Sequence, residues 1–161
     1  MAAVLSSMAD AQSATLRKIE SLKPEEVDVD NHRFSLNPMV SIGYNGCRAV
    51  ILKGRNSQMG LSHTPPYKDI GSYLDEAEII FGGYEGMGAI VFPKFEKFEE
   101  KCLDRGISPL RLPWLEAADA AFSESHEKRD IIVVPSALEI FVYTATREFS
   151  GTFSGSRLKR H

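Results

Sequence analysis

A cysteine and a histidine are the two residues of this sequence whose types and placement could do chemistry together. Cys47 ends the Gly-flanked turn GYNGC, and His63 ends the segment MGLSH. A thiol beside an imidazole is the minimal requirement for an activated sulfur nucleophile, because the imidazole can take the thiol proton. Backbone N–H groups on a tight turn can hold the oxyanion that forms when sulfur attacks an acyl carbon. The alternative is structural, since a free cysteine is often buried and inert.

The segment between these two residues predicts how they come together. The run RAVIL after Cys47 is aliphatic and β-branched, which favours a buried strand. The turn GRNSQMG follows it, and MGLSH is predicted to be a second strand. Two strands joined by a short turn pair antiparallel, so the start of the first lies beside the end of the second. We therefore expect Cys47 and His63 at the same end of a β-hairpin.

Strands outnumber helices along the rest of the chain, and the helices lie between strands. Apolar periodicity and turn residues predict these elements. The predicted helices are 8–22, 73–78, 93–105 and 113–122, and the further predicted strands are one around Phe34 and Leu36, 78–81, 89–92, 107–112, 131–134 and 138–144. Pro109 would confine the strand 107–112 to a sheet edge, because proline cannot donate to a ladder.

These elements predict the fold class and the organisation of the chain. Strands interspersed with a few helices are typical of an α+β protein, here a β-sandwich or mixed sheet with helices on the outside. We expect an N-terminal helical segment at 1–30 and a catalytic domain at 31–148. The residues 149–161 are rich in glycine and serine and end basic, which predicts a flexible basic tail.

Composition and charge narrow the classes of function. The 161 residues, 43% hydrophobic and 25% charged, suit one soluble domain with a real core. The net charge of −3 favours neither a nucleic-acid partner nor a membrane surface. No apolar run is long enough to span a bilayer, and the N-terminus lacks the features of a secretory signal. We expect a cytoplasmic protein, although delivery into another cell by a dedicated secretion machine would leave no mark in the sequence.

Neither a cofactor nor a metal is expected. Two cysteines outside any C-x-x-C motif fit free thiols in a reducing compartment. Cys102 lies on the apolar face of a predicted helix and is expected in the core. The segment GGYEGMG lacks the spacings of phosphate-binding loops, so a turn is the simpler interpretation.

The residues around Cys47 and His63 resemble those of a known family. Ser41, the turn GYNGC, the strand RAVIL and the context GLSH around His63 resemble the Thr/Ser–Cys–His constellation of bacterial protein glutamine deamidases. This family comprises the chemotaxis receptor deamidase CheD and the catalytic domains of cytotoxic-necrotizing and lethal-factor toxins. IIFGG at 79–83, the helix KFEEKCLDRGI and the paired end strands extend the similarity over 35–146. Ser41 stands where the family usually has threonine, and the helix before FGG is shorter than in CheD.

The resemblance implies a CheD-like fold and a thiol-dependent deamidase. His63 would take the Cys47 proton and give a thiolate at neutral pH, and the thiolate would attack a glutamine carboxamide of a partner protein. Ser41 would orient the imidazole, as the third member of a triad does. The products would be ammonia and a glutamate, so the partner would gain one negative charge.

Two other functions stay open at this level. Another Cys–His catalyst, such as a small amidase or a peptidase, would use the same pair of residues. A non-catalytic binding module could keep the fold without the chemistry. The sequence also leaves open whether the target belongs to chemotaxis or to a host cell attacked by a toxin-like effector.

Overall fold

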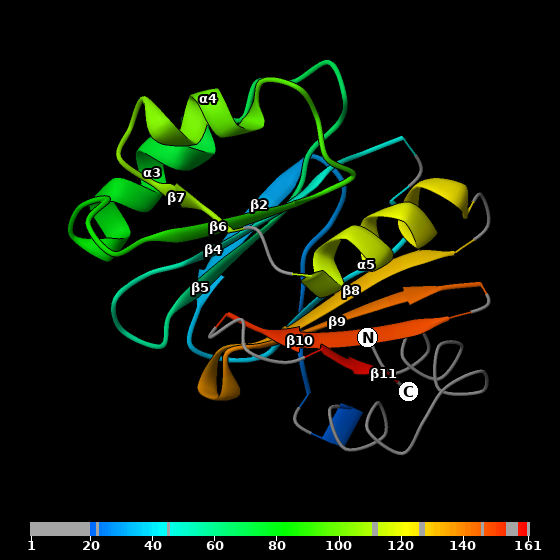
Figure 1. The fold of residues 1–161 in the computed structure, drawn as a ribbon. Helices are drawn as coiled ribbons and strands as arrows, with labels where there is room; N and C mark the ends of the chain where they lie inside the picture. The colour runs from blue at the N-terminus through cyan, green and yellow to red at the C-terminus, as the bar shows by residue number, and fades with distance from the viewer. Residues whose placement is uncertain are drawn as a thin grey trace.

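Two β-sheets pack against each other around one interior, and helices flank them (Figure 1). The computed structural model describes residues 20–21, 23–44, 46–110, 113–125, 128–145, 147–153 and 158–160. The strand order is β1-β3-β8-β9-β10-β11 in one sheet and β2-β5-β4-β6-β7 in the other. The predicted class, α+β with mixed sheets and few helices, is therefore confirmed.

The six-stranded sheet collects the early and late parts of the chain. Its strands are β1 (Glu25–Glu26), β3 (Met39–Ser41), β8 (Arg129–Val134), β9 (Glu139–Thr144), β10 (Glu148–Thr152) and β11 (Leu158–Arg160). β1 runs parallel to β3, and the other neighbours pair antiparallel. A 3-10 turn, η1 (Pro135–Ala137), connects β8 to β9. The predicted pair of end strands is thus confirmed as β8 and β9.

The five-stranded sheet carries the predicted hairpin. Its strands are β2 (Asn31–Ser35), β4 (Ala49–Lys53), β5 (Met59–His63), β6 (Gly88–Phe92) and β7 (Ser108–Pro109). β4 and β5 pair antiparallel, as the sequence predicted, and Ile51 lies opposite Leu61. β7 lies at the edge of this sheet, where Pro109 is tolerated because an edge strand needs fewer backbone donors.

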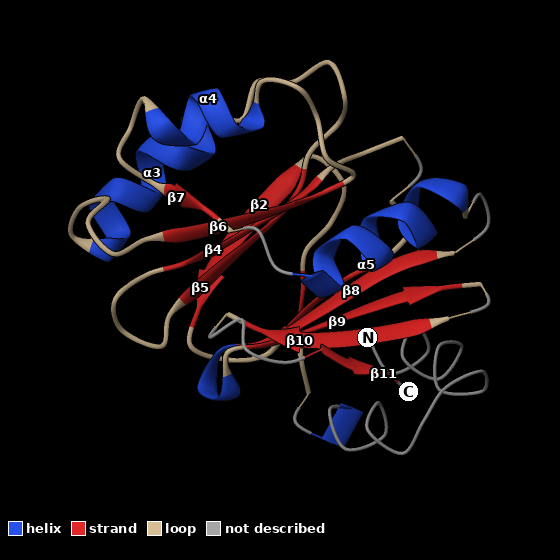
Figure 2. Cartoon of the chain, viewed as in Figure 1, coloured by secondary structure: helices blue, strands red, loops and turns tan. Residues whose placement is uncertain are grey.

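Helices lie against the sheets in the described part of the chain and are blue in Figure 2. α3 (Gly71–Phe81) and α4 (Phe98–Leu103) lie together on the outer side of the five-stranded sheet. α5 (Pro113–Glu124) lies at the side of the interior, where it contacts β6, β9 and β10. Among the described helices, none combines the length and the apolar composition that crossing a bilayer requires.

The main core lies between the sheets. Both inner faces and α5 contribute to it, and its members include Met39, Ile51, Leu61, Trp114, Phe122, Ile131, Val142 and Phe149. Trp114 packs so closely on β10 that a Cβ at Gly151 would lie 2.1 Å from Cε2 of its indole ring. Glycine at this position is therefore a packing requirement of the sandwich.

Two predicted elements are wrong. Residues 78–81, predicted as a strand, are the last turn of α3, which Gly82 ends in the left-handed conformation with its N–H bound to the Glu78 carbonyl. The prediction of a flexible tail is wrong for 149–152, because these residues belong to strand β10, which pairs with β9. Residues 158–160 form strand β11, which pairs with β10. Phe149 anchors β10 in the core with 1% exposure.

Other predicted boundaries shift. The helix predicted from Pro93 begins at Phe98, and the short helix predicted at 73–78 is the longer α3. The helix predicted at 113–122 is confirmed as α5. The N-terminal helix predicted at 8–22 falls almost entirely outside the described residues, and within the predicted segment 1–30 residues 25–26 form β1.

Candidate active site

The three residues singled out by the sequence lie where the two sheets meet. Ser41 is the last residue of β3 in the six-stranded sheet, and His63 is the last residue of β5 in the five-stranded sheet. Cys47 lies on the segment that leaves β3 and enters β4, so it lies on the connection between the sheets. The packing of the two sheets therefore brings these residues to one end of the sandwich. The hairpin alone would not place Ser41 there, because Ser41 belongs to the other sheet.

The hairpin brings Cys47 and His63 to neighbouring positions. An isolated bridge joins Arg48 with Thr64, through an N–H···O bond of 2.7 Å in one direction and 2.8 Å in the other. Cys47 precedes one bridge residue and His63 precedes the other. Side chains alternate along a strand, and Cys47 belongs to the same inner core as Ala49 of β4. The prediction that Cys47 and His63 share one end of the hairpin is confirmed.

Ser41 holds one nitrogen of the histidine ring. Its Oγ lies 2.8 Å from His63 Nδ1, and both side chains are fully buried. The Ser41 hydroxyl donates its hydrogen to the carbonyl of Val27, a residue tethered to β3 by its own N–H. Because the hydroxyl has a single hydrogen, Oγ can only accept at Nδ1, which must then carry the ring hydrogen. Nε2 is left with a lone pair and can act as a base.

Nothing in the described part of the chain occupies that lone pair. His63 Nε2 is buried and has no hydrogen-bond partner there. Buried polar atoms are nearly always bonded in proteins, so Nε2 is an exception among the described residues, and its lone pair can accept a proton. The backbone carbonyl of His63 accepts a bond of 2.7 Å from the N–H of Asp30, so the residue is held at both its ring and its backbone.

Tyr44 fixes the plane of the ring, a role that the sequence analysis missed. Its ring stacks on the imidazole of His63, with 3.9 Å between centroids and an interplanar angle of 11°. The Tyr44 hydroxyl donates to the Ser62 carbonyl at 2.9 Å, and its backbone is bound at both N–H and carbonyl by Arg129. The signal in the sequence was the aromatic residue inside GYNGC.

Burial determines the protonation states of Cys47 and His63. It lowers the pKa of His63 to about 4, against a smaller opposite effect from the charge of Asp28. Burial also raises the pKa of Cys47, and the nearby negative charge of Asp30 raises it further. The resting pair at neutral pH is thus a neutral thiol and a neutral imidazole. A resting thiolate, which the sequence analysis expected, is not favoured by these surroundings.

Cys47 is nearly buried, and it follows an exposed glycine. Cys47 is 8% exposed, while the preceding Gly46 is exposed and adopts φ +75°. In the described part of the chain, the N–H groups of Gly46 and Cys47 donate no hydrogen bond. They are the backbone donors closest in sequence to the sulfur. Within the same described residues, no group of three or more His, Cys, Asp or Glu side chains is placed to hold a metal ion.

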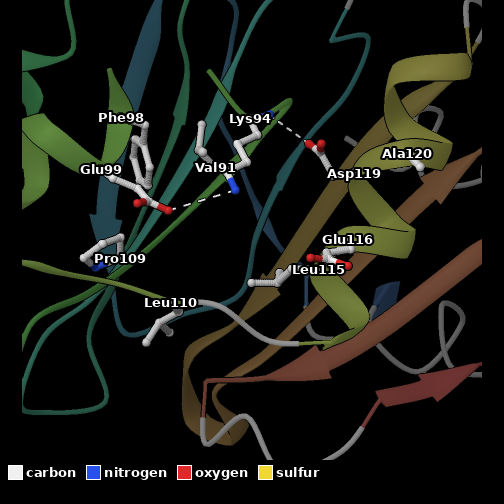
Figure 3. Close-up of a pocket in the computed structure, with 10 residues that line it drawn as sticks. All are labelled: Val91, Lys94, Phe98, Glu99, Pro109, Leu110, Leu115, Glu116, Asp119 and Ala120. Atoms are coloured by element: carbon white, nitrogen blue, oxygen red, sulfur yellow. Dashed lines mark hydrogen bonds and ion pairs between the residues drawn. The ribbon is translucent and has the colours of Figure 1, made fainter. Parts of the chain in front are cut away.

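A separate cavity of about 540 Å³ lies between β6, α4 and α5 (Figure 3). Its polar side chains include Lys94, Glu99 and Asp119, and the Lys94 N–H donates to the Asp119 carboxylate at 2.8 Å. Burial raises the pKa of Asp119. None of the three predicted site residues lines this cavity, so its size does not bear on the chemistry of Cys47.

Comparison with protein-family models and with curated proteins finds no match.

Proposed function

We propose that this protein is a glutamine deamidase acting on a partner protein, with a CheD-like fold. The observation that carries the proposal is the bonding of His63. The buried Ser41 hydroxyl accepts a hydrogen bond from Nδ1, and Nε2 has no partner among the described residues. His63 lies at the same end of the hairpin as Cys47. A histidine oriented by a buried acceptor and free at its other nitrogen is the arrangement that general-base activation of a nucleophile requires.

The first half of the reaction forms a thioester. As the Cys47 sulfur attacks the carboxamide carbon, its proton passes to His63 Nε2, because the resting thiol is neutral. The N–H groups of Gly46 and Cys47 stabilise the oxyanion of the tetrahedral intermediate. His63 then gives the proton to the leaving nitrogen, the C–N bond breaks and ammonia departs.

The second half regenerates the thiol. His63, neutral again, takes a proton from water, and the resulting hydroxide attacks the thioester carbon. The C–S bond breaks, and the proton on His63 returns to the sulfur. The net reaction is amide plus water giving carboxylic acid plus ammonia, so the partner gains a carboxylate.

Ammonia release from glutamine-containing proteins and peptides tests this proposal. Cys47→Ser and His63→Ala should each lower the rate by about a thousandfold or more. Cys102→Ala is the matched control, because Cys102 is fully buried in α4 and should leave the rate nearly unchanged. Full activity in either site variant would contradict the assignment.

Mass spectrometry separates the deamidase from the other Cys–His catalysts. Exchange of an amide for an acid adds about 1 Da to an intact partner, whereas a peptidase would cleave it. Cleavage that depends on Cys47 would support the peptidase alternative.

The second candidate is a binding module, and the state of Cys47 favours it. Cys47 is 8% exposed and the pKa of its thiol is raised, whereas many catalytic thiols are exposed and acidified. Iodoacetamide alkylation at neutral pH distinguishes the two without a known substrate. If His63 serves Cys47 as a base, His63→Ala should slow alkylation of Cys47. Equal rates in the wild type and the variant would favour the binding module.

A further inference from the structure

A groove of about 470 Å³ opens beside the end of the hairpin that carries Cys47 and His63. Its walls come from the first residue after Cys47, from the turn after Thr64 and from the segment between β6 and α4. Arg48 spans this groove, since its guanidinium lies 4.1 Å from the centroid of the Phe95 ring and donates to the Pro66 carbonyl at 3.4 Å.

Two hydrogen bonds of Asp30 tie the groove to the candidate site. The Asp30 N–H donates to the His63 carbonyl at 2.7 Å. The Asp30 carboxylate accepts a bond of 2.6 Å from Lys68, which lines the groove. A chain bound in the groove would therefore lie at the end of the hairpin that carries His63 and Cys47.

The groove carries a charge opposite to that of the whole chain. Its charged side chains are Arg48, Lys68, Lys97 and Lys101 against Asp69 and Glu96, while the chain as a whole has a net charge of −3. Lys68 pairs with Asp30 at 2.6 Å and Lys101 with Asp69 at 2.7 Å. Lys97 is exposed and makes no ion pair within the described residues, so its charge is available to a ligand.

Aromatic surface adjoins this charge. Tyr67 is 85% exposed on the turn that lines the groove, and the half-buried ring of Phe95 carries the Arg48 guanidinium on its face. An exposed tyrosine beside cations is typical of surfaces that bind peptide segments, because its ring offers contact area at a low cost in conformational entropy.

We infer that this groove binds an acidic segment of the protein substrate, with carboxylates of the segment on Arg48 and Lys97. The role of that segment in flanking a target glutamine rests on the proposed deamidase function. The preference of the groove for acidic chains is a separate property, which can be measured without turnover.

Peptide binding to the full-length Cys47→Ala variant tests the inference. The probes are two fluorescein-labelled peptides centred on glutamine, one flanked by glutamates and the other by lysines. At low salt the acidic peptide should bind about tenfold or more tightly than the basic one, and the difference should shrink as salt is added. Lys97→Glu should weaken binding of the acidic peptide about threefold to tenfold.

Lys53→Glu is the matched control, since Lys53 ends β4 at the opposite end from Arg48. It should leave binding unchanged. Equal binding of the two peptides, or no effect of Lys97→Glu, would overturn the inference even if the wild type releases ammonia. In another outcome, binding of the acidic peptide depends on Lys97 but the wild type releases no ammonia. That outcome would support acidic-peptide binding by the groove and count against the proposed deamidase activity.

Discussion

The hydroxyl of Ser41 and the imidazole of His63 form a hydrogen bond of 2.8 Å between the last residues of two strands that belong to different sheets. The bond therefore joins the sheets at the candidate site. Because Val27 receives the only hydrogen of the hydroxyl, the bond also selects the ring tautomer. The sandwich thus orients His63, the proposed base, and the thiol of Cys47 lies on the connection between its sheets.

Loss of the Ser41 hydroxyl should impair catalysis more than folding. In Ser41→Ala, Nδ1 loses its acceptor, so the ring is no longer confined to the productive tautomer. We expect kcat/KM for ammonia release to fall about tenfold to a hundredfold, since the triad partner acts through the histidine. The unpaired buried groups should lower the free energy of unfolding by about 1–3 kcal/mol, measured in urea.

Ser41→Thr is the control for that variant. It keeps the hydroxyl and should retain most of the activity. A Ser41→Ala protein that folds and turns over at the wild-type rate would show that the bond to His63 has no catalytic role.

Tyr44 should act through its ring rather than through its hydroxyl. Tyr44→Phe keeps the stack on His63 and loses the bond to the Ser62 carbonyl, so we expect activity within a few-fold and a loss of stability of about 1 kcal/mol. Tyr44→Leu removes the flat support and should lower kcat without a matching change in KM. Equal kcat in the two variants, measured by ammonia release, would contradict this role.

Protonation of His63 should couple stability to pH. Its pKa is about 4 in the folded chain and 6.5 in the unfolded chain, so between these values the unfolded state binds more protons. Stability is fully present above pH 6.5 and is lost as pH falls toward 4. The contribution of this one group is about 3 kcal/mol, and urea unfolding at a series of pH values measures it.

His63→Gln isolates that contribution, because all other groups titrate in both proteins. The variant should show a smaller loss of stability between pH 6.5 and 4 than the wild type. Identical slopes would mean that the imidazole is hydrated in the folded protein. In the wild type, kcat/KM should likewise hold down to about pH 5, because His63 stays neutral there.

The hairpin and the placement of Cys47 and His63 at one of its ends were predictable, because both depend on local pattern. An aliphatic run, a turn of reversing residues and a second strand fix which residues share an end. The bond from Ser41 could not be derived in this way, since β3 and β5 lie in different sheets. Only the resemblance to a family suggested it. The stack of Tyr44 depends on the same packing between sheets.

Two wrong predictions, those for 78–81 and 149–152, have a common physical cause. The apolar run EIIF at 78–81 was taken as a strand, yet Ile79 is 80% exposed on α3, whose buried face is set by Tyr73, Leu74 and Ala77. Composition alone does not reveal which apolar residues find a partner. The glycine and serine of 149–152 likewise indicated a tail, although Gly151 is small because Trp114 covers it.

The contact between Gly151 and Trp114 gives a last prediction. Gly151→Ala places a Cβ 2.1 Å from the indole, so α5 must move away from β10. We expect a loss of about 1–3 kcal/mol in the free energy of unfolding, as for other overpacked cores. Trp114 is the only tryptophan, so its fluorescence reports both the shift and the unfolding transition. Ser136→Ala, on an exposed turn, is the control. Wild-type stability and emission in Gly151→Ala would show that β10 is not packed under α5.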